Sequence, residues 1–131
     1  MLGARLTAAT AGIMNVTVGA LYLPSMPEEL VRRPLQPGQV SAVVYIENIG
    51  PLWSVMFIIT GVVLIMAAMR RRGFIPAHLG AVFVWAFYGA AILFSAFLTQ
   101  PPVPVVAGAI ASFTALVHLA VARGCAERGM R

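Results

Sequence analysis

The side chains that could do chemistry in this chain are few, and they lie in or beside apolar stretches. Glu47 stands next to an asparagine and a Gly-Pro pair in the run VVYIENIGPLW, residues 43–53. Asn15 interrupts an N-terminal apolar run, and His78 and His118 lie in two later ones. Because ionisable groups inside a bilayer are functional by default, the position of each residue relative to a membrane has to be settled first.

Composition indicates the class of protein. The chain has 131 residues, of which 60% are hydrophobic and 10% are charged, whereas soluble domains carry about 25% charged residues. A chain with so few charges cannot cover a water-exposed surface, which predicts an integral membrane protein in contact with the lipid bilayer. The single cysteine, Cys125, excludes an internal disulfide framework and a CxxC motif.

Four apolar stretches are long enough to cross a bilayer, since a hydrocarbon core of about 30 Å takes about 20 helical residues. The predicted spans are residues 2–23, 51–69, 75–98 and 103–122, with an outer loop of residues 24–50. The first is the least hydrophobic. The predicted fold is therefore an all-α membrane protein, a four-helix transmembrane bundle that forms one domain over residues 1–131.

Prolines and short connections indicate how the spans are joined. Pro76 and Pro104 are expected in the first turns of the third and fourth spans, where a missing N–H does no harm. The connections 73–75 and 99–103 are so short that the helices they join must be antiparallel neighbours.

The arginines give the predicted orientation. With four spans, one side of the membrane carries seven of them: Arg5, Arg70, Arg71, Arg72, Arg123, Arg128 and Arg131. The other side carries Arg32 and Arg33. Arginine-rich segments face the cytoplasm, so both termini are expected to be cytoplasmic in a multi-pass protein of the cell membrane.

The net charge of +5 is accordingly read as a topology signal that contacts anionic lipid headgroups, and no nucleic-acid partner is expected. The first span has one alternative interpretation, a cleaved signal peptide with Arg5 as its basic region and Val18–Ala20 as its cleavage site.

Small residues at helical spacing predict where helices approach closely. They are Ala8, Gly12 and Gly19, on one face with Asn15, and Ala107, Ala111 and Ala115 in the last span. We expect Asn15 to be a hydrogen-bonding clasp between helices; the alternative is a polar group that lines a pore or substrate site. Such faces pack within the bundle or between subunits, and a homo-oligomer or small membrane complex is expected.

The third span is rich in aromatic residues. Trp85 and Tyr88 lie near its middle, where they are expected to pack between helices; stacking on a ligand is the alternative. His78 and His118 fall in the same leaflet of antiparallel helices and could approach each other. A pH switch or a two-histidine metal contact is conceivable, but no side chain in either span completes a ligand set, and structural histidines are expected.

Glu47 is expected at the membrane boundary. Counting about 20 residues back from the arginine triplet reaches residue 50, which leaves Glu47 among the headgroups, with Asn48 as N-cap of the second span and Pro51 in its first turn. Glu47 could alternatively gate or bind cations at the outer mouth. The loop before it is equally compatible with a partner-binding role and a connector packed on the bundle.

The chain carries no phosphate-binding loop, GxSxG or HExxH motif, and no carboxylate pair within a span. We therefore expect a non-enzymatic, self-associating membrane protein without a cofactor, pore-forming in the manner of the holin-like proteins that it resembles in size and composition. The alternative is a small-molecule transporter or membrane-complex subunit that binds an apolar or cationic ligand between helices. An enzyme or redox subunit would need metal or haem on the histidine pair.

Overall fold

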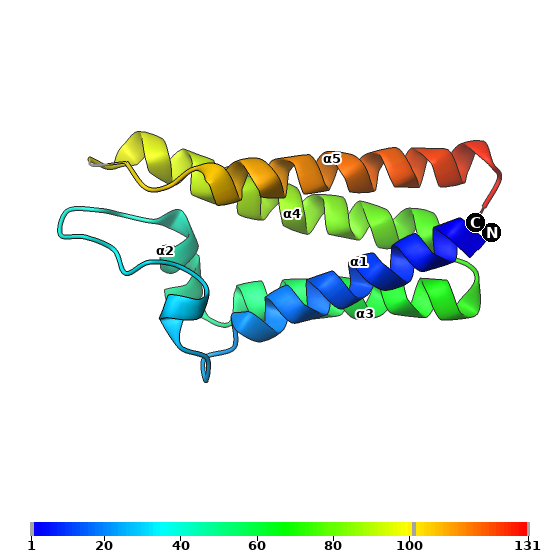
Figure 1. Cartoon of the computed structure of the whole chain (residues 1–131), viewed down its shortest axis with the longest axis horizontal. Helices are drawn as coiled ribbons and strands as arrows, with labels where there is room; N and C mark the ends of the chain where they lie inside the picture. The colour runs from blue at the N-terminus through cyan, green and yellow to red at the C-terminus, as the bar shows by residue number, and fades with distance from the viewer. Residues whose placement is uncertain (1, 101, 131) are drawn as a thin grey trace.

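The computed structural model describes residues 2–100 and 102–130, and within them all regular structure is helical. The elements are α1 (Leu2–Leu21), the 3-10 turn η1 (Glu28–Leu30), α2 (Ala42–Ile49), α3 (Leu52–Arg70), α4 (Phe74–Leu98) and α5 (Val106–Glu127). Four long helices lie side by side (Figure 1). Both chain ends and the α3–α4 turn lie at one end of the bundle, and α2 with its preceding loop lies at the other.

Three helices, α3, α4 and α5, are long and apolar enough to cross a membrane. The predicted first span, α1, does not reach the same apolar character, because Arg5, Asn15 and three threonines interrupt it. Large apolar side chains are nevertheless exposed on the outward faces of all four long helices, among them Ile13, Ile59, Phe83 and Val106. Exposed apolar surface on every side of a bundle is what contact with lipid requires.

The span boundaries predicted from the sequence agree closely for two helices. Helices α3 and α4 begin and end within one residue of the predicted 51–69 and 75–98. Pro76 is in the first turn of α4, as expected. The prediction for Pro104 is wrong, because α5 begins at Val106 and Pro104 lies in the extended connection before it.

Residues 42–49 form a separate short helix, α2, which the sequence did not predict. The predicted capping role of Asn48 is wrong, because Asn48 lies in the last turn of α2. The chain turns at Gly50, and Pro51 precedes α3 without any side-chain capping bond. A proline tolerates this position because the first N–H groups of a helix have no intrahelical partner.

The bundle is built from two tightly packed antiparallel pairs, α1 with α3 and α4 with α5. In the first pair, a Cβ atom on Gly61 would lie 2.7 Å from the carbonyl oxygen of Gly12. In the second, a Cβ atom on Gly89 would lie 3.0 Å from the carbonyl oxygen of Gly108. The backbones therefore touch at glycines in both pairs, and the contact between α3 and α4 joins the pairs into one bundle.

The residues predicted to pack between helices occupy these contacts with one exception. On α1 the buried residues are Ala8, Gly12, Asn15 and Gly19, all on the face that meets α3. On α5, Ala111 and Ala115 are buried, but Ala107 is exposed and the neighbouring Gly108 lies in the contact with α4. In the first turn of α5, the residue that contacts α4 is therefore Gly108, one position after the predicted Ala107.

Candidate functional site

Asn15 is fully buried at the centre of the bundle and links three helices. Its Nδ2 donates a hydrogen bond of 3.1 Å to Oγ1 of Thr60 on α3. Its Oδ1 accepts a hydrogen bond of 2.8 Å from Nε1 of Trp85 on α4. The Thr60 hydroxyl donates in turn to the carbonyl of Met56. These polar groups are bonded to one another, so Asn15 occupies the position of an interhelical clasp and does not line an open path.

Tyr88 belongs to an aromatic cluster between Asn15 and the α2 end of the bundle. Its hydroxyl lies 2.5 Å from that of Tyr22, and its ring packs edge-on against Trp53 at 5.2 Å and Phe57 at 5.6 Å between centroids. Phe57 also packs edge-on against Trp85 at 4.9 Å. Trp85 and Tyr88, which were expected to pack between helices, contact the rings of neighbouring protein side chains here, and the alternative of stacking on a ligand has no support from these contacts.

Glu47 forms a salt bridge with Arg32, which also pairs with Glu28 at 2.9 Å. Burial by itself would lower the pKa of Arg32, but its hydrogen bond to Glu47 and the charges of Glu47 and Glu28 raise that pKa above its ordinary value. Arg32 therefore stays charged, and the pair fastens the loop after α1 to α2. Glu47 lies outside the long helices, at the end of the bundle that holds the loop.

Helix α2 is held down by two further hydrogen bonds. The indole Nε1 of Trp53 on α3 donates to the carbonyl of Val43 at 3.0 Å. The backbone N–H of Ala42 donates to Oγ of Ser95 on α4 at 2.7 Å. Both bonds satisfy polar groups that burial would otherwise leave unpaired, and together they seat α2 on the ends of α3 and α4.

His78 on α4 and His118 on α5 form a direct pair, with their Nδ1 atoms 2.8 Å apart. Both rings are buried, at 0% and 4% exposure. Nε2 of His78 is buried and has no hydrogen-bond partner among the described residues. Within residues 2–100 and 102–130, no group of three or more His, Cys, Asp or Glu residues is placed to hold a metal ion. The pair is therefore a hydrogen-bonding element in which Nε2 of His78 is buried without a partner.

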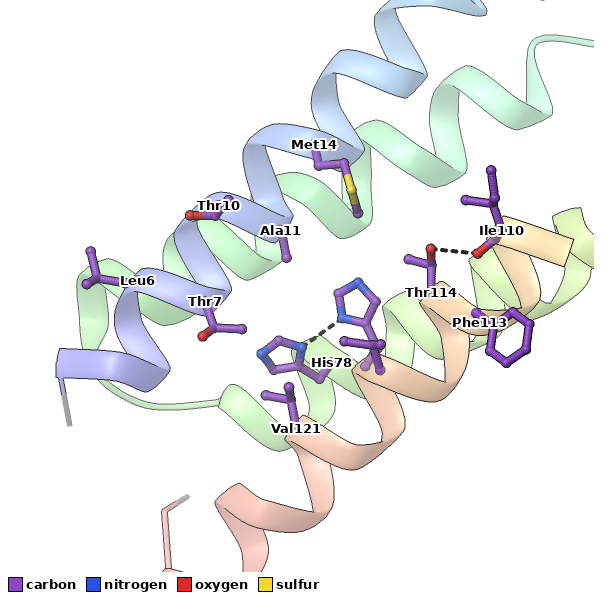
Figure 2. A pocket seen from close by; sticks show the side chains of 12 residues that line it. Leu6, Thr7, Thr10, Ala11, Met14, His78, Ile110, Phe113, Thr114 and Val121 are labelled. Carbon is purple, nitrogen blue, oxygen red and sulfur yellow. Dashed lines mark hydrogen bonds between the residues drawn. The ribbon is translucent and has the colours of Figure 1, made fainter. Parts of the chain in front are cut away.

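A groove of about 720 Å³ runs between α1 and α5, where the two helix pairs do not close on each other (Figure 2). The α1 wall is formed by Leu6, Thr7, Thr10, Ala11 and Met14. The α5 wall is formed by Ile110, Phe113, Thr114, Val117 and Val121, and the two histidines lie between the walls. The lining is mainly apolar, and the two histidine rings supply its nitrogen atoms.

The sequence indicated that the two histidines could approach each other but did not predict this groove. The reason is that helical spacing shows which face of a helix is apolar, not which neighbour it faces. Thr7 and Thr114 lie on opposite walls of the groove in Figure 2, but the hydroxyl of each is bonded to a carbonyl of its own helix, on Gly3 and Ile110 respectively. Threonines pair in this way in many helices, so they gave no specific signal.

Comparisons with known proteins found no relative from which the role of these residues could be inferred. The chain matches no protein-family model, no curated protein and no solved structure.

Proposed function

We propose that the chain is a four-span integral membrane protein with both termini in the cytoplasm, and that it acts by binding another membrane component rather than by catalysis. The fourth crossing is supported by how α1 lies on α3. Gly12 meets Gly61, and a Cβ on Gly19 would lie 3.0 Å from the carbonyl oxygen of Ser54, seven residues earlier in α3. Two helices in contact along their length occupy the same depth, so a membrane crossed by α3 is crossed by α1 as well.

The charge distribution supports the orientation. Arg5 donates from Nε to the carbonyl of Ala68 at 3.0 Å, so the N-terminal arginine lies beside the arginine triplet that ends α3. Helix α5 ends at the same end of the bundle (Figure 1), with Arg123 in its last two turns and Arg128 directly after it. The described arginines other than Arg32 and Arg33 thus gather at one end, as cytoplasmic segments do.

Cysteine accessibility tests this topology in intact bacterial cells. In a Cys125→Ser background, cysteines replace one of two exposed residues, Gln36 in the loop or Arg128 in the tail. A membrane-impermeant maleimide is expected to label Gln36→Cys from outside and Arg128→Cys only after permeabilisation. A third position, the exposed Gly3 at the start of α1, tests the fourth crossing, and Gly3→Cys is expected to be labelled only after permeabilisation. Labelling of Gly3→Cys and Gln36→Cys from the same side would mean that α1 does not cross and would overturn the four-span proposal. Labelling of Gln36→Cys and Arg128→Cys from the same side would contradict three crossings by α3, α4 and α5.

The observation that carries the binding role is the groove between α1 and α5, with its buried and only partly satisfied histidine pair. Lateral grooves between helices are common binding sites in bundles. The polar side chains at mid-depth, by contrast, are hydrogen-bonded to one another, with Asn15 bonded to both Thr60 and Trp85. Transport through the interior between α1 and α4 would have to break these contacts.

A holin-like pore is the second candidate, and it depends on self-association, because the mid-depth polar side chains of one chain are bonded to each other. Reconstitution into dye-loaded vesicles separates the two functions. A binding protein is expected to leave the dye inside at all protein-to-lipid ratios. Release that rises steeply with protein density, together with depolarisation of expressing cells, would favour the pore and count against the binding role.

A further inference from the structure

We propose that the groove between α1 and α5 binds a long-chain carboxylic acid, with its acid group hydrogen-bonded to Nε2 of His78 and its chain directed towards Met14 and Phe113. This inference rests on the proposed four-span insertion, because the groove opens towards lipid only if α1 crosses the membrane. It adds the chemical class of the ligand to the proposed binding role.

The histidine pair explains the choice of head group. When both rings are neutral, one Nδ1 must carry the proton and the other must accept it across the 2.8 Å contact. Nε2 of His78 is then either an N–H donor or a bare acceptor, according to which ring holds that proton. A carboxylic acid offers a carbonyl acceptor and an O–H donor, so it can pair with Nε2 in either tautomer.

The histidine pair lies nearer one end of the groove, and mainly apolar side chains line the rest. Thr7, His78 and Val121 lie towards the helix ends that carry the arginines, and Met14, Ile110 and Phe113 lie deeper. From Leu6 to Met14 and from Ile110 to Val121 the walls are about 12 to 16 Å long at 1.5 Å per residue. An amphiphile bound along this axis has its head near the bundle end and its tail at mid-membrane, as in a lipid leaflet.

The uncharged lining and the volume of the groove restrict the chemical class of the ligand further. No Arg, Lys, Asp or Glu lines the groove, so a phosphate or quaternary ammonium head group would enter without a counter-charge, which is costly in a low-dielectric site. A volume of about 720 Å³ lies within the usual range for a single small ligand, about 300–1,000 Å³. A single-chain carboxylic acid meets both conditions when it binds in its protonated form, which burial in a low-dielectric site favours.

Binding has to be accompanied by a small local movement. The His78 ring is 0% exposed although it lines the groove, so the head group reaches Nε2 only when a side chain at the rim changes rotamer. The hydrogen bond gained offsets that movement, because a buried ring nitrogen without a partner is unfavourable. Thr7 and Thr114 already donate their hydroxyl protons to the carbonyls of Gly3 and Ile110, so they can only accept a hydrogen bond from the acid and cannot donate one to it.

Photolabelling of the full chain in lipid nanodiscs tests the site. The probe is hexadecanoic acid with a diazirine near the middle of its chain, and labelled peptides are identified by mass spectrometry. Label is expected in residues 6–14 and 110–121, and unlabelled hexadecanoic acid is expected to compete about tenfold better than methyl hexadecanoate, which lacks the O–H. Equal competition by the ester, or equal labelling of the exposed α4 face around Phe83, would overturn the proposal.

Three substitutions make the test specific to Nε2. His78→Asn keeps an amide near the Nδ1 position beside His118 but removes the atom at Nε2, and it is expected to reduce competable labelling about tenfold. His78→Gln keeps a polar group near Nε2 and is expected to retain more labelling than His78→Asn. Ser54→Ala is the matched control, because Ser54 Oγ is likewise buried without a partner but lies on α3, outside the groove; its labelling is expected to be unchanged.

Folding and occupancy by other partners are checked in the same preparations. Each variant is compared by circular dichroism and gel filtration, and unchanged labelling in a folded His78→Asn protein would overturn the proposal. Efficient cross-linking of two chains through Ile110→Cys, in a Cys125→Ser background, would instead assign the groove to a second copy. If the cysteine-accessibility experiment gives four spans but labelling is not competable, this inference fails while the proposed topology stands.

Discussion

Nε1 of Trp85 and Oδ1 of Asn15 are 2.8 Å apart at mid-height of the bundle, where they join α4 to α1. Nδ2 of the same asparagine bonds to Thr60 of α3, so one side chain fastens three of the four long helices. In a membrane, helices gain nothing from burial away from water, and such polar contacts and close packing supply the association energy. The asparagine that interrupts the first apolar stretch is therefore central to the stability of the bundle.

Replacing Asn15 with leucine is expected to lower the free energy of unfolding in detergent by about 1–2 kcal/mol, because two interhelical hydrogen bonds are lost and the Trp85 indole is left unpaired. Equilibrium unfolding by a denaturing detergent, followed by circular dichroism, measures the change. Thr17→Val is the control, since the Thr17 hydroxyl is exposed and bonds to the carbonyl of Ile13 within its own helix. Equal losses in the two variants would contradict the central role of Asn15.

The Asn15–Trp85 bond is also expected to appear as coupling between the two residues. Trp85→Phe removes the donor and keeps an aromatic ring against Phe57. In a double-mutant cycle with Asn15→Leu, the second substitution should cost about 0.5–1.5 kcal/mol less than it does alone. Strictly additive losses would mean that the two side chains do not depend on each other.

Gly61→Ala is expected to separate α1 from α3. The added Cβ would lie 2.7 Å from the carbonyl oxygen of Gly12 and 2.8 Å from the backbone nitrogen of Val16, and backbone atoms cannot rotate away as a side chain can. A loss of about 1–3 kcal/mol in unfolding free energy is expected from such overpacking. Gly124→Ala, where the new Cβ meets nothing within 4 Å, should be neutral or slightly stabilising because alanine favours helix.

Glu47→Gln is expected to loosen the loop between α1 and α2. The substitution removes one of the two carboxylate partners of Arg32 and leaves Glu28. The Arg32 side chain is 20% exposed and that of Glu47 is 34% exposed, and such partly exposed pairs contribute about 0.5–1 kcal/mol. Amide hydrogen exchange should become faster in residues 27–47. Glu29→Gln is the control, since no salt bridge involves Glu29 among the described residues; unchanged exchange in Glu47→Gln would show that the pair does not hold the loop.

Trp53→Phe is expected to release α2 from the bundle without unfolding it. The substitution keeps an aromatic ring beside Tyr88 but deletes the hydrogen bond to the Val43 carbonyl. Exchange in residues 42–49 should become faster by about fivefold, which corresponds to a loss of about 1 kcal/mol. Tyr45→Phe serves as the comparison because Tyr45 is 68% exposed. Faster exchange throughout α3 as well would show that Trp53 supports the whole helix rather than α2.

The sequence by itself determined the helices and many of their buried faces. Boundaries follow from local chemistry, such as the arginine triplet at Arg70–Arg72 and the proline in the first turn of α4, and the boundaries of α3 and α4 were predicted to within one residue. The face of α1 formed by Ala8, Gly12, Asn15 and Gly19 was predictable because residues three and four apart share one side of a helix. The apolar composition likewise indicated a membrane protein, because it depends on the residues themselves and not on how they pack.

Only the tertiary structure decided which faces meet. The pairing of α1 with α3, the partners of Asn15, the short helix α2 and the groove beside His78 all depend on contacts between residues far apart in the chain. Helical periodicity gives the direction of each side chain around its own axis, but the choice of neighbour follows from how well whole surfaces fit. The 2.8 Å contact between His78 and His118 is therefore a property of the packed bundle. It brings together two histidines that are 40 residues apart in the chain, and the candidate site is built on this pair.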